Sequence, residues 1–190
     1  GVASSNSNGS GNNVEPSIRV LSPFPSQVRS DLIAAGCADG SVRLFDKRCS
    51  PQDCRIRVYR EHGGSIMSVC LKDNQTSIVS GCSLGSVTVM DLRSRHSSAV
   101  LHQWDVGADV TTMVCHQSAD LVACGNPSKI TVYYSLNGKS QNVLRSNEGF
   151  MGGKIGHPSC LSFHPYMVQL AVGFVDNTVA VYEPSPGKIW

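Results

Sequence analysis

A glycine that recurs at a nearly constant interval constrains the fold of this chain more than any other feature. It stands at Gly36, Gly81, Gly125 and Gly173, so the intervals are 45, 44 and 48 residues. Each copy follows an apolar run and precedes a run rich in valine or isoleucine. A repeat of this length is typical of small antiparallel sheets that bury their faces only by stacking on a neighbour. The sequence therefore predicts an array of sheets, an architecture that more often binds than catalyses.

Each copy of the repeat predicts two strands joined by a tight turn. The first copy reads DLIAAGCADGSVRLFD over residues 31–46. Its first run is apolar on both sides and its second run alternates, so we expect the first strand to be buried on both faces and the second on one. Asp39 and Asp176 mark the turns of the first and fourth copies, because Asp tolerates the backbone of short hairpins. The second copy has Leu84 and Gly85 there, and the third is one residue shorter, so both are degenerate.

Two more strands per unit are expected between these hairpins, one inner and one outer. Four strands per unit of 40 to 45 residues predict an all-β fold, a β-propeller of about four blades. The blades are expected at about 17–60, 61–105, 106–146 and 147–190. The outer strands are predicted at 55–59 and 100–104, and the inner strands at 18–21, 65–71, 110–115 and 159–163.

The first 16 residues differ from the rest, because they are rich in Ser, Asn and Gly with almost no apolar content. Such a segment cannot offset the entropy of ordering, so residues 1–16 are predicted to be a disordered linker. No stretch reaches the roughly 18 apolar residues needed to cross a bilayer, and no signal peptide is visible. These observations predict a cytosolic protein.

Eight cysteines raise the question of disulfides or a metal site. Three of them, Cys70, Cys115 and Cys160, lie 45 residues apart in the predicted inner strands. We therefore expect small core residues of separate blades, free thiols and a reduced compartment. No metal is predicted, since Cys49 and Cys54 are the nearest pair and no second cluster accompanies them. The remaining cysteines, Cys37, Cys82 and Cys124, adjoin a repeat glycine.

No catalytic motif is present, so neither an enzyme nor a cofactor is predicted. The chain lacks a nucleophile elbow, a Walker glycine loop and an H-E-x-x-H helix. His116 and His164 each end an inner strand, where we expect them to bond local backbone. His62 and Ser80 are expected to form a buried polar pair, incomplete because Leu84 replaces the turn aspartate.

Six basic residues gather near the first hairpin. They could form a patch for phosphate or an acidic partner. Alternatively, Arg55 and Arg57 alternate with apolar residues on an outer strand, where charge protects an exposed edge. Nucleic acid is not an expected partner, because aromatic residues make up only 6% of the chain and its net charge is only +2. The six are Arg43, Lys47, Arg48, Arg55, Arg57 and Arg60.

The repeats resemble WD40 repeats, although Phe45-Asp46 and Met90-Asp91 stand where the Trp-Asp pair would be. The literal pair, Trp104-Asp105, is out of phase and is expected to end an outer strand. A closer resemblance is to the C-terminal WD40 domain of the Raptor family, carried by YREH at 59–62, ADLVACG at 119–125, GFMG at 149–152 and SCLSFHP at 159–165. Since WD40 rings usually have seven blades, the resemblance implies a fragment that lacks about three.

The resemblance also implies a function. Raptor proteins are non-catalytic scaffold subunits of target-of-rapamycin complex 1, which recruit substrates and regulators in nutrient-responsive growth signalling. The implied partners are the target-of-rapamycin kinase and the other subunits, with small GTPases and kinase substrates reached through the rest of the full-length protein. No direct membrane insertion is implied. The implied location is the cytoplasm, with recruitment to the lysosomal surface.

A different class of protein remains open. Asp46-Lys47-Arg48 and Asp91-Leu92-Arg93 repeat an Asp-x-Arg ending in adjacent units, which resembles the adaptor-binding box of WD40 substrate receptors for cullin-RING ubiquitin ligases.

The candidate interaction loop is residues 145–157, because it combines polar character with the large apolar Phe150 and Met151, followed by Lys154. Phe150 could equally pack beneath its own loop.

Overall fold

The computed structural model describes residues 17–23, 31–72, 76–94, 99–145 and 156–184, and their regular structure consists of strands. The predicted linker 1–16 lies outside these residues. The strands are β1 (Ile18–Pro23), β2 (Leu32–Cys37), β3 (Val42–Asp46), β4 (Arg55–Tyr59), β5 (Ile66–Leu71), β6 (Ser77–Cys82), β7 (Ser86–Asp91), β8 (Val100–Asp105), β9 (Thr112–Cys115), β10 (Leu121–Gly125), β11 (Lys129–Tyr134), β12 (Ser140–Arg145), β13 (Pro158–Phe163), β14 (Leu170–Phe174) and β15 (Val179–Tyr182).

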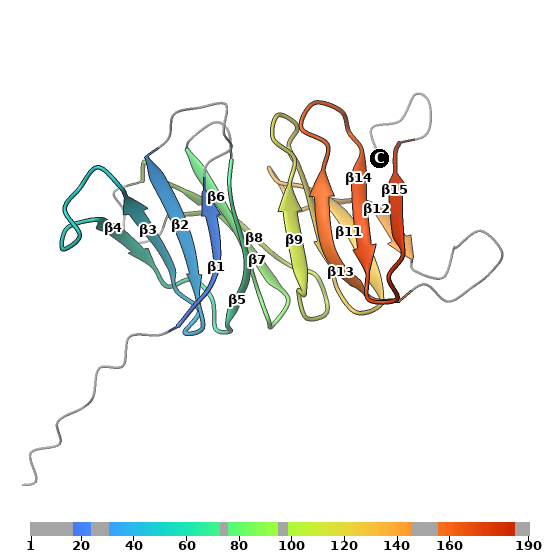
Figure 1. The fold of residues 1–190 in the computed structure, drawn as a ribbon, viewed down its shortest axis with the longest axis horizontal. Coiled ribbons are helices and arrows are strands. Elements are labelled where there is room, and N and C mark those ends of the chain that lie inside the picture. The colour runs from blue at the N-terminus through green and yellow to red at the C-terminus, as the bar shows by residue number, and fades with distance from the viewer. Residues whose placement is uncertain (1–16, 24–30, 73–75, 95–98, 146–155, 185–190) are drawn as a thin grey trace, which may run out of the picture.

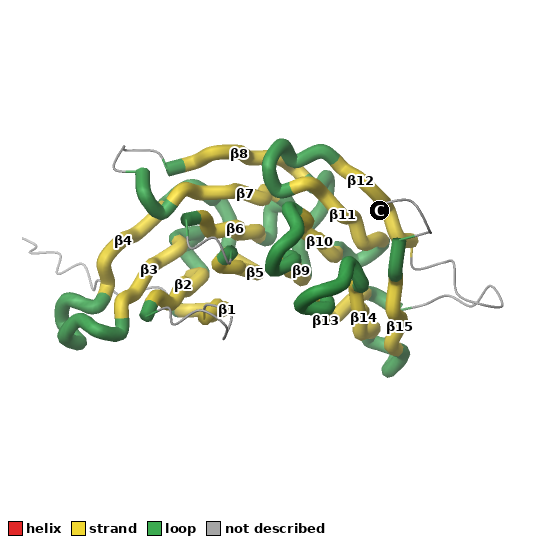
Figure 2. Tube along the Cα trace, turned by 90° about the horizontal axis from the view of Figure 1, so that it is seen from above, coloured by secondary structure: helices red, strands yellow, loops and turns green. Residues whose placement is uncertain are grey.

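These strands form four antiparallel sheets, which we call blades 1 to 4. Blades 1, 2 and 3 have the orders β1-β2-β3-β4, β5-β6-β7-β8 and β9-β10-β11-β12, and blade 4 has the order β13-β14-β15. The blades stack side by side along an arc, with β1, β5, β9 and β13 on its inner side (Figures 1 and 2). The predicted fold class, an all-β propeller with four blades, is confirmed. Trp104 lies near the end of the outer strand β8, as predicted.

The repeat glycine marks a point of close approach between blades. In each sheet it pairs with an aliphatic residue of the third strand, as Gly36 does with Val42 and Gly125 with Ile130. A Cβ on Gly36 would lie 2.3 Å from Cγ2 of Ile66 in the next blade. At Gly36 only glycine lets the neighbouring inner strand pack this closely.

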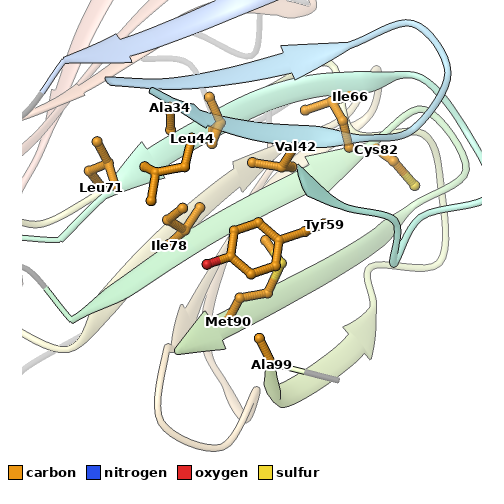
Figure 3. Packing of buried hydrophobic residues seen from close by; sticks show 11 residues of the cluster. Ala34, Val42, Leu44, Tyr59, Ile66, Leu71, Ile78, Cys82, Met90 and Ala99 are labelled. Atoms are coloured by element: carbon orange, nitrogen blue, oxygen red, sulfur yellow. The ribbon is translucent and has the colours of Figure 1, made fainter. Parts of the chain in front are cut away.

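The hydrophobic core lies between the sheets and is divided into three clusters, one at each junction of neighbouring blades. We call the side of a blade toward the next blade its forward face and the opposite side its rear face. Figure 3 shows the first cluster, where Val42 and Leu44 of blade 1 meet Ile66, Ile78 and Met90 of blade 2. Each junction therefore buries one forward face against one rear face.

The third strands differ from the alternation predicted for them. In β7 and β11 four consecutive residues are buried, and in β3 even Arg43 is only 6% exposed. Only β15 alternates, because blade 4 packs on blade 3 with its rear face while its forward face has no sheet against it among the described residues. The prediction was wrong for blades 1 to 3 because it ignored burial on both faces.

The cysteine spacing also has a different meaning from the one predicted. Cys70 pairs with Val79, Cys115 with Val122 and Cys160 with Gly173, so the three occupy different registers. A shift of one residue moves a side chain to the other face of a sheet. Cys70 therefore lies on the forward face of blade 2 and Cys115 on the rear face of blade 3, and the two thiols meet in one core. Cys160 is exposed, so its predicted core position is wrong; all eight thiols are free.

Candidate interaction surface

The interaction loop predicted from the sequence falls largely outside the described residues. Phe150, Met151 and Lys154 belong to the segment 146–155, which the structure does not describe. The described end of this connection joins blades 3 and 4. Gly156 N donates to Asp176 Oδ2 at 2.8 Å, and His157 Nδ1 contacts the carbonyl oxygen of Pro127. The preference for these three residues therefore stays a prediction.

The turn aspartates organise the loops at one end of the blades. Asp39 Oδ1 accepts hydrogen bonds from Ser41 N at 2.9 Å and from Ser41 Oγ at 2.6 Å. Asp176 Oδ1 accepts from Thr178 N at 3.1 Å and from Thr178 Oγ1 at 2.6 Å. The Thr178 hydroxyl and the Gly156 amide lower the pKa of Asp176 below its usual value. Both aspartates thus hold a turn in place.

Blade 2 has Leu84 at the position of this aspartate, and a buried histidine, His62, precedes its inner strand. His62 is 8% exposed, and its Nε2 lies 2.7 Å from Ser80 Oγ, which confirms the predicted pair. His62 Nδ1 is buried without a hydrogen-bond partner among the described residues. Burial lowers the pKa of His62 to about 4, so the ring is neutral at pH 7. Leu84, at the aspartate position, is 65% exposed.

One position links blade 2 to blade 3, and blade 3 to blade 4, at the opposite end of the blades. It directly follows the inner strand and holds Lys72 in blade 2 and His116 in blade 3. Lys72 is 6% exposed, and its Nζ donates to Ala119 O at 3.3 Å and to Asp120 Oδ1 at 3.2 Å in blade 3. His116 is 1% exposed, and its Nε2 lies 3.1 Å from Met167 O in blade 4. We call these two contacts the blade latches.

His164 occupies the same position in blade 4. Its Nδ1 accepts hydrogen bonds from Tyr166 N at 3.2 Å and from Met167 N at 3.0 Å. His116 Nδ1 likewise accepts from Ala119 N at 2.9 Å. The prediction that both histidines bond local backbone is confirmed. The latches through His116 and Lys72 were not predicted from the sequence, although both residues directly follow an inner strand.

The basic residues near the first hairpin are divided among separate partners. Arg48 Nη2 lies 2.6 Å from Asp46 Oδ2, and Arg93 Nε lies 3.2 Å from Asp91 Oδ1 in the equivalent turn of blade 2. Arg57 Nη1 donates to Leu92 O at 3.1 Å, and its guanidinium lies over the Tyr59 ring. Lys47 pairs with Asp31 and Arg60 with Asp39.

Arg43 and Arg55 line a hollow of about 450 Å³ on blade 1, together with Ile18, Phe45, Pro51, Gln52 and Cys54. Four of the six basic residues thus lie beside a carboxylate or a carbonyl oxygen, and the other two line this hollow.

The described residues hold no group of three or more His, Cys, Asp or Glu side chains that could bind a metal ion. They also include no helix that is long and apolar enough to span a membrane. The buried polar side chains of His62, Lys72 and His116 are engaged in holding loops and joining blades. The turns between strands also present exposed surface, as at Leu84 and Tyr166.

Known proteins resemble this chain at the level of family and of fold. Residues 18–157 match the family model described as nucleolar protein 10-like, N-terminal domain. The Dictyostelium discoideum protein named Protein raptor homolog is 29% identical over 165 residues, which cover 86% of this chain and 11% of the relative. The Schizosaccharomyces pombe protein named Target of rapamycin complex 1 subunit mip1 is 30% identical over 167 residues, which cover 87% of this chain and 12% of the relative.

A solved structure shares the fold. The crystal structure of Chaetomium thermophilum Raptor superposes with a TM-score of 0.75 at 20% identity, and the match covers 90% of this chain and 16% of that one. This chain therefore spans about an eighth of the length of the relatives that it matches. The predicted similarity to Raptor proteins is confirmed, whereas the predicted position in a C-terminal domain stays a prediction.

Proposed function

This chain belongs to the β-propeller family described as the nucleolar protein 10-like N-terminal domain, and we propose that it is a non-catalytic scaffold domain of a target-of-rapamycin complex 1 subunit. The observation that carries the proposal is the similarity to proteins named as Raptor and as a subunit of that complex, which extends over 86% and 87% of the chain. We further propose that the domain occupies the C-terminal part of that subunit.

The architecture supports a scaffold role. Latched blades hold the turns between strands in fixed positions, and fixed turns lose little conformational entropy when they bind. We propose that some of these turns, other than the Asp-x-Arg turns that follow β3 and β7, contact the target-of-rapamycin kinase and other subunits of the complex. In the full-length protein this contact would support recruitment of substrates, and of small GTPases, in nutrient-responsive growth control. The protein would then act in the cytoplasm and at the lysosomal surface.

A second function has one specific observation in its favour. The Asp46 and Asp91 turns share a geometry, because Arg48 N and Arg93 N donate to the preceding Asp Oδ1 at 3.0 and 2.8 Å. The Arg48 and Arg93 side chains are 69% and 72% exposed. Two matching Asp-x-Arg turns on adjacent blades would suit the adaptor of a cullin-RING ubiquitin ligase.

A binding experiment tests both proposals. The tagged chain is incubated with purified target-of-rapamycin kinase and, separately, with a purified ligase adaptor. We expect the kinase to be retained. The matched control is Arg48→Ala/Arg93→Ala, which should retain the kinase equally well, since it alters only the Asp-x-Arg turns. Retention of the adaptor, its loss in this variant and no retention of the kinase would replace the first proposal with the second.

A further inference from the structure

The turn between β13 and β14 exposes two large side chains next to each other. Tyr166 is 71% exposed and Met167 is 50% exposed, and Pro165 before them is also exposed. We call these three residues the knuckle. It lies at the end of blade 4 where the inner strand turns back, above β13 and β14 in Figure 1. Three consecutive exposed residues of this size form a local patch rather than a scattered apolar residue.

The backbone of the knuckle is fixed from both sides. His164 Nδ1 accepts from Tyr166 N and Met167 N, and His164 N donates to Gln169 O at 2.8 Å. From blade 3, His116 Nε2 lies 3.1 Å from Met167 O. Since His116 Nδ1 already accepts from Ala119 N, its Nε2 carries the proton and donates to that carbonyl. The knuckle is therefore preorganised, and little entropy is lost when it binds.

The equivalent turn of blade 3 shows that this backbone does not need large apolar side chains. It begins at His116, whose N donates to Leu121 O at 2.9 Å, as His164 N does to Gln169 O. Gln117, Ser118 and Ala119 stand where blade 4 has Pro165, Tyr166 and Met167. The same scaffold thus carries small or polar residues in one blade and large apolar ones in the next. The backbone of the turn alone therefore does not require large side chains at these positions.

The charge around the knuckle favours a protein partner over a membrane or nucleic acid. The described part of blade 4, residues 156–184, contains Asp176 and Glu183 and no Lys or Arg. Gln169 Nε2 donates to Glu183 Oε2 at 3.1 Å, which places this carboxylate beside the turn. Anionic lipids and phosphate backbones bind clusters of Lys and Arg. Tyrosine and methionine are instead enriched at the centres of protein interfaces.

We propose that the knuckle is an anchor that inserts Tyr166 and Met167 into an apolar cleft on the target-of-rapamycin kinase, with basic groups at the rim of that cleft facing Glu183. The choice of partner rests on the proposed function. The T-shaped contact of the Tyr166 ring with His164, at 6.2 Å between centroids, sets the direction of the tyrosine. His164 is a positioning residue in this arrangement, because it acts by holding the turn.

The test measures binding of the 190-residue chain to purified target-of-rapamycin kinase. Tyr166→Ala/Met167→Ala should raise the equilibrium dissociation constant by at least about tenfold. The matched control, Gln117→Ala/Ser118→Ala in the turn of blade 3, should leave it unchanged. Melting temperatures show that both variants fold. His164→Ala should weaken binding, whereas His164→Asn should restore most of it, because an Asn oxygen can also accept from the turn amides.

The outcomes separate this inference from the proposed function. If the wild-type chain binds the kinase and the Tyr166/Met167 variant binds equally well, the anchor is wrong and the scaffold proposal stands. If the wild-type chain does not bind the kinase, the proposed function fails and the anchor fails with it. Vesicles of phosphatidylcholine and phosphatidylserine give a further arm. Flotation of the wild-type chain with them, lost in the Tyr166/Met167 variant, would overturn the protein partner in favour of a membrane.

Discussion

Blades 3 and 4 place the same kinds of residue in the same registers, yet their forward faces have opposite surroundings. Ile130 and Val132 of β11 are 2% and 0% exposed, while Val179 and Val181 of β15 are 74% and 66% exposed. In both blades the first residue of the pair lies opposite the repeat glycine. Burial in this fold is therefore decided by the neighbouring sheet and not by the strand that carries the residue.

The largest effect should come from a charge placed at this matched position. Val132→Asp introduces a carboxylate into the core between blades 3 and 4, where no cation faces it within that cluster. We expect the free energy of unfolding to fall by about 4 kcal/mol. Val181→Asp, in the same register of blade 4, should change it by less than about 0.5 kcal/mol. Urea denaturation followed by circular dichroism measures both, and equal losses would show that the two forward faces are covered alike.

The internal blade 2 also holds a histidine, His62, away from water. The pKa of His62 is lowered to about 4 by burial, against an ordinary value of 6.5. Between these two values the unfolded chain binds the proton and the folded chain does not. Stability is therefore full above pH 6.5 and falls by about 3 kcal/mol as the pH drops to 4. Denaturation curves across this range should show the loss, and His62→Gln should flatten the slope. If the pH dependence of the unfolding free energy were unchanged in that variant, a group other than His62 would take up the proton.

The equivalent histidines of blades 3 and 4 test the latches. His116 is buried, bonds Ala119 N and Met167 O, and its ring packs on Phe163 at 5.3 Å between centroids. His116→Ala should cost about 2 kcal/mol of unfolding free energy. His164→Ala removes only bonds within its own exposed turn and should cost less than about 1 kcal/mol. Thermal and urea unfolding compare the two, and a larger loss for His164 would contradict the latch.

The sequence predicts the architecture well because the repeat glycine reports backbone packing, which recurs in each blade. It also predicts the His62 and Ser80 pair, since both positions are fixed relative to Gly81. It does not predict which face of a sheet a side chain occupies, because that depends on strand register. Cys70 and Cys115 keep a constant spacing but differ by one residue in register, so they face each other.

The candidate surface is harder to predict than the fold. Exposure of Tyr166 depends on which residues the neighbouring blade covers, and no local pattern encodes that. Phe150 and Met151 met the same criterion of large apolar residues in a polar loop, and they lie outside the described residues. When the turns of blades 3 and 4 are aligned by strand register, the histidine that holds the turn recurs, whereas the exposed residues after it differ.

The smallest effect on stability should come from the turn of blade 2, which has lost the aspartate that blade 4 keeps. Asp176 accepts hydrogen bonds from Thr178 and Gly156, and the equivalent donors in blade 2 are Ser86, two residues beyond Leu84, and Gly64, two residues before β5.

Leu84→Asp should therefore complete the turn of blade 2 and raise the free energy of unfolding by about 1 kcal/mol. Leu84→Asn, which keeps an acceptor without the charge, should raise it by less, and Leu84→Ala should leave it nearly unchanged. Urea denaturation of the three variants at pH 7 measures the order. If Leu84→Asp and Leu84→Ala have the same free energy of unfolding, the turn of blade 2 is held by its backbone alone and an aspartate adds nothing there.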